Sequence, residues 1–199
     1  MEEKASQDSQ PLVSANLPTT HGEYDMLAFH SGKAELPHIA LVSKELDKSG
    51  VVDIRIHSEC LTGDVFGSLR CDCGEQLQAT MRHFEEHGGV LLYLRQEGRG
   101  IGLVNKLKAY NLQDQGLDTA EANIALGFHA DERDYTPAIA ILNSLGIKQV
   151  RILTNNPEKF EAFENSGITV IERLALKMPS HRENEFYLDT KKRVFGHWL

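Results

Sequence analysis

The sequence predicts an α/β fold: a single domain in which a mixed sheet is flanked by helices. Short apolar runs alternate with amphipathic stretches along most of the chain. The run Val90–Leu94 is wholly apolar, which is typical of a strand that is buried on both faces. Strand-like and helix-like stretches alternate in the second half, which favours parallel strands, whereas the first half favours antiparallel pairing.

Further strands are predicted where apolar and polar residues alternate or where a short apolar run lies between turn residues. The alternation is clearest at Val51–His57, where Val52, Ile54 and Ile56 share one face. The predicted strands are Tyr24–His30, His38–Val42, Val51–His57, Val150–Leu153 and Ile168–Ile171.

Helices are predicted by apolar residues that recur on one face and by start and stop signals. Glu75–His87 has such a face and is followed by Gly88. Thr136 is expected to cap a helix that has Pro137 in its first turn and ends at Gly146. Other helices are expected over about 103–113, from the cap Asp118, and from the cap Asn156 to about Gly167.

Composition and charge favour a globular protein that acts on a small molecule. The 199 residues suffice for one domain, and they are 41% hydrophobic and 25% charged. The formal net charge of -8 argues against a nucleic-acid partner, which would require a basic face. A phosphorylated small molecule stays compatible with this charge, because a local cluster of Arg and Lys can act within an acidic protein.

Neither a membrane segment nor a targeting signal is expected. No apolar run approaches the roughly 18 residues that cross a bilayer, so no membrane partner is predicted. The N-terminus is acidic and polar, unlike a secretory signal, and the protein is therefore expected to be cytoplasmic. Residues 1–14 lack periodicity and are expected to form a disordered tail ahead of a single domain at 15–199.

The three cysteines, Cys60, Cys71 and Cys73, lie close together in the chain. Any disulfide would leave one thiol over, and a reducing compartment disfavours a disulfide. Three thiolate ligands and an open fourth position are typical of catalytic zinc, which lowers the pKa of bound water to about 7. The residues alone leave two alternatives open: structural zinc, for which His57 is the nearby fourth ligand, and three cysteines that are merely buried.

A glycine-rich loop follows the buried strand and carries Arg95, Glu97 and Arg99. Glycines allow a backbone to approach a phosphate closely, and the start of the next helix offers free N–H groups. The loop is not a P-loop, since the Gly-Lys-Ser/Thr ending is absent, and its glycines lack the dinucleotide-binding spacing. The embedded Arg and Glu side chains indicate a ligand-binding loop rather than a simple turn.

A second candidate anion site is the stretch 154–159, where a strand ends and a helix begins. Ligands collect at the carboxyl ends of strands in α/β sheets. Thr154 and Lys159 would be free to bind an anion there, while Asn156 caps the helix. The charge run 131–134 by itself indicates no more than a solvated loop.

Six segments of the chain together resemble GTP cyclohydrolase II, the family that opens riboflavin biosynthesis. They occur in the family's order, and the resemblance covers about Leu17 to the C-terminus. A companion domain that makes the four-carbon riboflavin precursor does not accompany them, so the stand-alone form is expected. The segments are 55–59 (RIHSE), 60–74 (the three cysteines), 95–99 (RQEGR), 112–116 (LQDQG), 130–133 (ADER) and 153–157 (LTNNP).

This resemblance implies that residues 15–199 form a GTP cyclohydrolase II domain. The implied reaction is hydrolysis of GTP to formate, diphosphate and a diamino-ribosylamino-pyrimidinone 5′-phosphate. The implied cofactors are Zn²⁺, one per subunit with three cysteine ligands and a water, and Mg²⁺ bound with the triphosphate. The implied assembly is a homodimer, and Cys60, Cys71 and Cys73 match the family's zinc ligands.

The resemblance also implies roles for individual residues. Asp131 matches the proton acceptor, Arg133 the nucleophile, and Tyr110 an aromatic residue linked to ring opening. The positions that match GTP-binding residues are Arg55, Ile56, His57, Ser58, Glu59, Gln76, Glu97, Gly98, Arg99, Thr119, Thr154 and Lys159.

Two points of chemistry bear on these roles. An arginine nucleophile must lose a proton, and at about 1.36 kcal/mol per pKa unit a neutral Arg133 at pH 7 costs on the order of 7 kcal/mol. The physical alternative is that Arg133 clamps the α-phosphate. Mg²⁺ is expected to be held through the substrate phosphates and one or two carboxylates, for which Glu97, Asp131 and Asp134 are available.

Other functions were weighed against this one. A paralogue that completes only diphosphate release or only ring opening is disfavoured by Tyr110 and the intact cysteines. A regulatory protein with structural zinc and no turnover is a different class that the sequence leaves open. A zinc-stabilised nucleic-acid binder is disfavoured by the acidic charge. The aromatic C-terminal segment Tyr187–Leu199 is expected to dock on the domain or on a second subunit.

Overall fold

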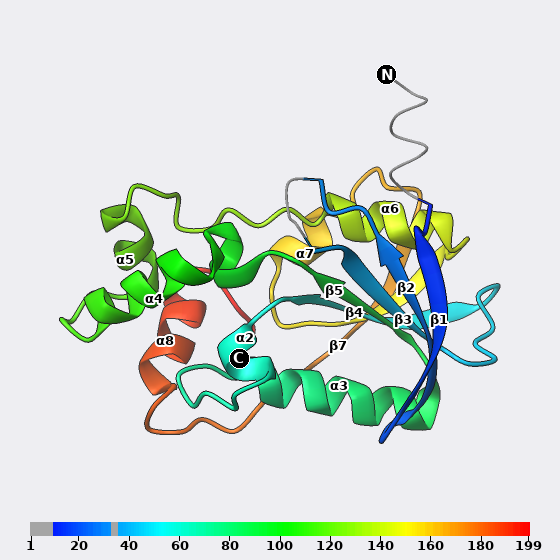
Figure 1. Cartoon of the computed structure of the whole chain (residues 1–199), viewed down its shortest axis with the longest axis horizontal. Helices are drawn as coiled ribbons and strands as arrows, with labels where there is room; N and C mark the ends of the chain where they lie inside the picture. The colour runs from blue at the N-terminus through cyan, green and yellow to red at the C-terminus, as the bar shows by residue number, and fades with distance from the viewer. Residues whose placement is uncertain (1–9, 33–35) are drawn as a thin grey trace.

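A single mixed sheet forms the centre of the molecule (Figure 1). The computed structural model describes residues 10–32 and 36–199. In that part of the chain the sheet has seven strands in the order β1-β2-β3-β5-β4-β6-β7. The strands are β1 (Val13–Thr19), β2 (Gly22–Phe29), β3 (His38–Ser43), β4 (Val51–Ser58), β5 (Val90–Leu94), β6 (Gln149–Leu153) and β7 (Thr169–Leu174).

Strand directions divide the sheet into two halves. β1, β2, β3 and β5 pair antiparallel with one another in that order. β4 pairs parallel with both β5 and β6, and β6 pairs parallel with β7. The predicted mixed sheet, antiparallel at first and parallel later, is therefore confirmed.

The edge strand β1 was not predicted. It begins at Val13, inside the segment assigned to a disordered tail, and it pairs with β2 through the turn before Gly22. Most of its side chains are exposed, which explains why the sequence lacks a clear burial pattern here. Residues 1–9 of the expected tail lie outside the described residues.

Helices cover both faces of the sheet. Helix α3 (Cys73–His87) lies along one face, where Met81 and Phe84 pack with Tyr24 and Leu91 (Figure 1). On the other face lie α6 (Thr136–Ser144) and α7 (Glu158–Glu161). Ala138, Ile141 and Leu142 of α6 and Phe163, which follows α7, belong to the larger core cluster. The strands contribute Val52, Ile54, Val90, Leu92, Val150 and Ile152 to the same cluster.

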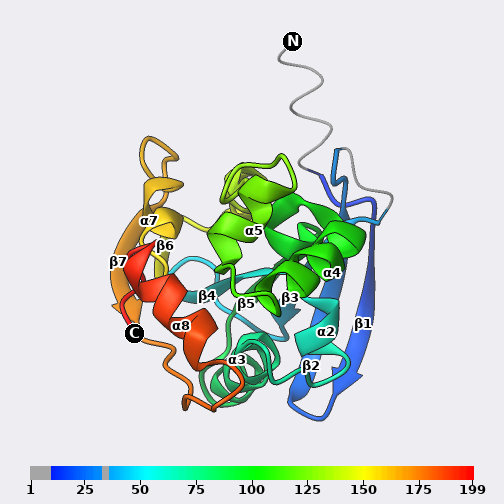
Figure 2. The same ribbon diagram turned by 90° about the vertical axis from the view of Figure 1, so that its left-hand side faces the viewer.

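A third group of helices gathers at one end of the sheet (Figures 1 and 2). It includes α4 (Gly102–Gln113), α5 (Thr119–Ala125) and the C-terminal α8 (Glu185–Arg193). Two short helices, α2 (Leu61–Asp64) and η1 (Glu97–Gly100), follow β4 and β5 at the same end. The carboxyl ends of β4, β5 and β6 therefore face a group of loops and helices rather than open solvent.

Helix ends differ from the prediction at two places. Thr136 does not cap α6; instead the Asp134 carboxylate accepts hydrogen bonds from the Thr136 N–H and hydroxyl, both at 2.8 Å. α7 ends at Glu161 rather than near Gly167, since the Ser166 hydroxyl donates to the Phe163 carbonyl and holds a turn.

Two predicted caps are confirmed. The Asp118 side chain accepts from the N–H groups of Ala120 and Glu121, and the Glu121 side chain accepts from the Asp118 N–H, which forms a capping box at α5. The Asn156 side chain accepts from the N–H of Glu158 at the start of α7. No helix in the described ranges is both long and apolar enough to span a bilayer.

Candidate active site and metal centre

The loops that follow β4, β5 and β6 enclose a cavity of about 1060 Å³, solvent at its mouth included. Ligands collect at the carboxyl ends of strands in open α/β sheets. Helices α4 and α5 and the C-terminal segment complete the walls.

Most of the predicted site residues line this cavity. Ile56 and Asp131 are the exceptions: Ile56 is fully buried beneath it, and Asp131 reaches it only through Arg133. The lining residues that the sequence singled out are Arg55, His57, Ser58, Glu59, Cys60, Cys71, Cys73, Gln76, Glu97, Gly98, Arg99, Tyr110, Thr119, Arg133, Thr154 and Lys159.

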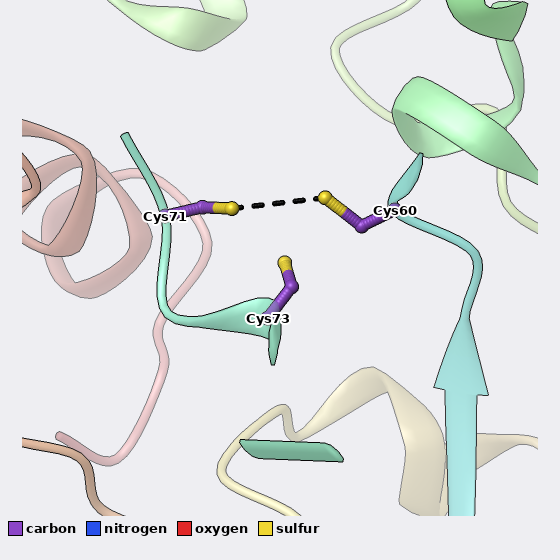
Figure 3. Close-up of side chains that lie close together, drawn as sticks. All are labelled: Cys60, Cys71 and Cys73. Carbon is purple, nitrogen blue, oxygen red and sulfur yellow. Dashed lines mark hydrogen bonds between the residues drawn. The ribbon is translucent and has the colours of Figure 1, made fainter. Parts of the chain in front are cut away.

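The three cysteines converge on one point (Figure 3). Cys60 follows the end of β4, Cys71 lies in the loop before α3, and Cys73 is the first residue of α3. Their sulfur atoms all lie within 4.8 Å of one another, and the Cys60 and Cys71 sulfurs are 3.6 Å apart. All three are free thiols.

The cysteine cluster fits a zinc ion. Tetrahedral ligands about 2.3 Å from zinc lie about 3.8 Å apart, close to the separation of the Cys60 and Cys71 sulfurs. Gly63 lets the thiols approach, since a Cβ atom there would lie 3.0 Å from the Cys71 sulfur and 3.2 Å from the Cys60 sulfur. A Cβ atom on Gly74 would lie 2.3 Å from the Gly63 carbonyl oxygen, so both glycines are required for this packing.

Lys106 from α4 stabilises negative charge on Cys60. Its ammonium group lies 3.1 Å from the Cys60 sulfur and 2.7 Å from a carboxylate oxygen of Glu97. Hydrogen bonds from the Cys71 and Cys73 thiols, together with Lys106, hold the pKa of the Cys60 thiol well below its ordinary value. A thiolate at Cys60 is therefore stabilised by the adjacent lysine.

His57 is not a fourth ligand. Its Nε2 atom lies 3.0 Å from the Asp64 carboxylate, which also accepts hydrogen bonds from the Cys60 N–H and the Tyr93 hydroxyl. Burial lowers the pKa of His57, although Asp64 opposes the shift. The ring positions the loop that carries Cys60, and the cluster keeps three protein ligands.

Gln76 connects the metal loop to the sheet. Its side-chain oxygen accepts from Arg55, and its amide donates over 2.6 Å to Asp72, which stands between two of the cysteines. Arg55 also donates to the Leu153 carbonyl, and burial lowers its pKa to about 10. This buried network fixes the cysteine loop relative to the ends of β4 and β6.

Three cations of the cavity have no carboxylate partner. Arg55, Arg99 and Lys159 line the cavity, and within residues 10–32 and 36–199 none of them forms an ion pair. Arg55 and Lys159 are also buried, at 5% and 4% exposure. Buried charges normally require a partner, so this excess of positive charge indicates an anionic ligand.

Lys159 shows the effect of this excess charge most clearly. Its ammonium group donates to the Ile56 carbonyl over 2.6 Å. Burial, followed by the neighbouring guanidinium groups of Arg55 and Arg133, holds its pKa well below the ordinary value. An anion in the cavity would relieve this penalty.

Asp131 and Arg133 form a partly buried ion pair rather than part of a solvated loop. Nε of Arg133 lies 2.9 and 3.0 Å from the two carboxylate oxygens, and Nη2 donates to one of them as well. Burial lowers the pKa of Arg133, but Tyr135 and the Asp131 carboxylate outweigh it, and the pKa lies above its usual range. Arg133 is therefore a charged guanidinium.

Several other predicted residues are held by protein partners. Glu97 accepts from Lys106 and from the N–H of Leu61, and Glu59 pairs with Arg95 at 2.8 Å. The Thr154 hydroxyl accepts from the Asn156 N–H. Thr119 lines the cavity at the start of α5, and Ser58 accepts from Gln96.

Tyr110 stands beside the cysteine cluster. Its hydroxyl is 3.3 Å from the Thr62 hydroxyl, which itself lies 3.7 Å from the Cys60 sulfur. The Arg70 guanidinium lies 4.7 Å from the Tyr110 ring centroid. Burial raises the pKa of Tyr110, so its hydroxyl is protonated at neutral pH.

The cavity also contains residues that the sequence did not single out. Lys106 could have been found, because it precedes Tyr110 by one helical turn and so shares its face. Lys191 and His197 lie far along the chain from the other site residues. Neither they nor Arg70 was assigned a binding role from a sequence motif.

Comparison with known proteins places the chain in a family. The family model of GTP cyclohydrolase II matches residues 10–175. GTP cyclohydrolase-2 of Histophilus somni (strain 2336) is 51% identical over 191 residues, 96% of this chain and 88% of that protein. The enzyme of the same name from Haemophilus influenzae (strain PittGG) is 49% identical over 192 residues, 96% and 89% of the two chains.

Longer relatives share the same region. Riboflavin biosynthesis protein RibBA of Staphylococcus saprophyticus is 51% identical over 187 residues, which are 94% of this chain and 47% of that protein. This chain thus spans about half the length of that relative. The family model matches most of the chain, and two relatives are about half identical over nearly their whole length. The chain therefore belongs to the GTP cyclohydrolase II family.

Proposed function

We propose that this chain is a GTP cyclohydrolase II that releases formate and diphosphate from GTP in riboflavin biosynthesis. One observation carries the proposal: a three-cysteine centre lines the same cavity as three cations that have no carboxylate partner among the described residues. The cysteines suit a metal that activates water, and the cations suit a triphosphate. Few ligands other than a nucleoside triphosphate require both.

The cysteine centre is proposed to act at the purine. A zinc ion bound there would supply Lewis-acid activation of water near neutral pH. Lys106 holds charge on Cys60 and orients Glu97. The Tyr110 hydroxyl, protonated and adjacent, can donate a proton or a hydrogen bond as the ring opens.

The cations of the cavity are proposed to bind the triphosphate. Arg55, Arg99 and Lys159 supply positive charge that no carboxylate neutralises within the described residues. Mg²⁺ is proposed to enter with the triphosphate, because the available carboxylates already have partners: Glu97 binds Lys106, and Asp131 binds Arg133. Such a magnesium ion would be held mainly through phosphate oxygens.

Asp131 and Arg133 are proposed to act at the α-phosphate. A charged guanidinium paired with a carboxylate favours the clamp over the nucleophile, since Asp131 stabilises the form that cannot attack. Asp131 remains the candidate proton acceptor in the nucleophile scheme. A covalent guanylyl adduct on Arg133 would support that scheme instead.

The protein is further proposed to be a cytoplasmic homodimer. Exposed apolar side chains after α2 support a self-association surface: Val65 is 65% exposed, Phe66 74% and Leu69 57%. Sedimentation of the purified protein tests the assembly, and a monomer at all concentrations would contradict it.

Product analysis tests the proposed function. Purified protein is incubated with GTP and Mg²⁺, with and without a zinc chelator. Formate and diphosphate should appear in equal amounts and the purine absorbance should change, while the chelator should abolish ring opening. Cys71→Ser should lose formate release and keep part of the diphosphate release. Zinc content of one per chain without any turnover of GTP would contradict the proposal.

A further inference from the structure

The C-terminal segment, residues 185–199, contains α8 and borders the cavity. It follows residue 175, where the match to the family model ends. Tyr187, Lys191 and His197 of this segment line the cavity together with residues of β4, β5 and β6. The segment therefore forms a wall of the site and is not a free tail.

Two anchors hold this wall in place. Lys191 forms a buried ion pair with Asp72 of the cysteine loop. The N–H of Trp198 donates to the Asn155 carbonyl over 2.9 Å, and the Trp198 ring packs edge-on against Phe160 at 5.6 Å. The segment is thus attached on both sides of the cavity, to the metal loop and to the loop after β6.

The segment also orients Arg99. The Arg99 guanidinium lies 4.0 Å from the Phe195 ring centroid and 5.9 Å from that of Tyr187. Its Nη1 atom is buried and has no hydrogen-bond partner in the described residues. A buried donor without a partner is costly, so this atom marks the position of a missing acceptor.

His197, in the C-terminal segment itself, also has a ring nitrogen without a partner among the described residues. Its Nε2 atom is buried and has no partner within the described ranges, while its backbone N–H donates to the Lys191 carbonyl over 3.1 Å. Burial, with the cations Lys191, Arg133, Lys159 and Arg99 around it, lowers its pKa to about 3. The ring is neutral and can carry its proton on Nε2.

We propose that the C-terminal segment is part of the substrate site and that His197 is a binding residue for the phosphates of GTP. The Nε2–H group donates to a phosphate oxygen, and Arg99, whose Nη1 has no partner in the described part of the chain, lines the same cavity. The cations that surround His197 select the anionic end of the ligand rather than the guanine. This inference rests on the proposed function, since it names which part of that site recognises the triphosphate.

Binding of two half-ligands to the full-length protein tests the proposal. Calorimetry measures the Kd of inorganic diphosphate with Mg²⁺ and the Kd of guanosine, for wild type, His197→Ala and His197→Gln. Glutamine places an amide donor near the position of Nε2. Phe186→Ala is the control, because Phe186 is a neutral aromatic residue of the same segment that is 56% exposed and outside the cavity.

His197→Ala should weaken diphosphate binding about tenfold, the loss of one hydrogen bond to a charged group, and leave guanosine within about twofold. His197→Gln should recover most of the diphosphate affinity, and Phe186→Ala should match wild type. Unchanged diphosphate binding, or equal weakening of both ligands, would overturn the proposal. A wild type that binds both ligands but releases no formate from GTP would instead contradict the proposed function and leave this comparison valid.

Discussion

Lys106 places its ammonium group 3.1 Å from the sulfur of Cys60, within a helix that begins 42 residues further along the chain. Three thiolates and a zinc ion would together carry a net negative charge. The lysine offsets that charge in a cavity that is proposed to bind a triphosphate as well. Its second contact, with Glu97, fixes the carboxylate that receives the N–H of Leu61 at the start of α2.

Replacement of Lys106 should therefore weaken zinc binding. Lys106→Met keeps the apolar stem and removes the charge, and an outer-shell contact of this kind is typically worth about 10–100-fold in metal affinity. Competition with a zinc chelator measures the change. Lys108→Met is the matched control, since Lys108 is an exposed lysine of the same helix. Equal zinc affinity in the two variants would show that Lys106 does not support the metal centre.

The close packing of Gly63 against the three cysteines predicts that Gly63→Ala disturbs the metal centre. The added Cβ would lie 3.0 Å from the Cys71 sulfur and 3.1 Å from the Cys73 Cβ, so the loop must move. The zinc content should fall well below one per chain, and overpacking should lower the free energy of unfolding by about 1–3 kcal/mol. Atomic absorption and thermal unfolding measure the two effects.

Gly50→Ala serves as the control for that variant, because the nearest atom to its Cβ would be a flexible Asp47 oxygen at 3.8 Å. Full zinc content in Gly63→Ala would mean that the cysteines tolerate another arrangement.

Sequence patterns predicted the parts of the fold that bury apolar side chains. The strands β2 to β6 and the helices α3 and α6 supply most of the two core clusters, and their apolar runs or repeating apolar positions are visible in the sequence. Helix α8 was missed because its buried residues are Thr190 and Lys191, which are polar and gave no period. Lys191 is buried through an ion pair with Asp72, a partner 119 residues away, and no local pattern can reveal such a contact.

The site shows the same division. The cysteines were found because they lie close together in the chain. The glycine-rich loop and residues 153–157 were found because each lies at the carboxyl end of a strand. The motif containing Asp131 and Arg133 was found only by resemblance, since the charge run alone suggested a solvated loop. His197 depends on the path of the C-terminal segment, which only the folded chain determines.

Anion binding should be coupled to protonation of Lys159. Burial, with Arg55 and Arg133, lowers the pKa of Lys159 in the absence of an anion, whereas a phosphate beside it would raise the pKa again. Between these two pKa values, binding takes up a proton, and the affinity falls as the pH rises through the lowered pKa of the free protein. Calorimetry of diphosphate binding in buffers with different ionisation enthalpies measures the uptake.

Lys159→Met should lose that proton uptake and bind diphosphate more weakly. Lys148→Met, which alters an exposed lysine, should keep the wild-type uptake. If the uptake persists unchanged in Lys159→Met, another group accepts the proton and the assignment is wrong.

The pair of Asp131 and Arg133 allows the two roles of the arginine to be separated. As a clamp, Arg133 needs only a positive charge that reaches the phosphate, so Arg133→Lys should keep turnover. Its kcat/KM should fall by about one to two orders of magnitude, because lysine cannot bind a phosphate in the bidentate manner. As a nucleophile, the guanidinium itself forms the covalent bond, and the variant should lose diphosphate release almost entirely. Arg151→Lys is the control, since Arg151 pairs with Asp53 on the sheet and does not line the cavity.

A trapping experiment gives the independent readout. Wild-type protein is mixed with GTP and Mg²⁺, quenched under alkaline conditions that preserve a phosphorus–nitrogen bond, and examined by intact-mass spectrometry. The clamp predicts no added mass, because a guanidinium held charged by Asp131 does not attack phosphorus. A guanylyl adduct that maps to Arg133 and disappears in Arg133→Lys would establish the nucleophile. In that case substrate binding would have to break the ion pair with Asp131 before the reaction.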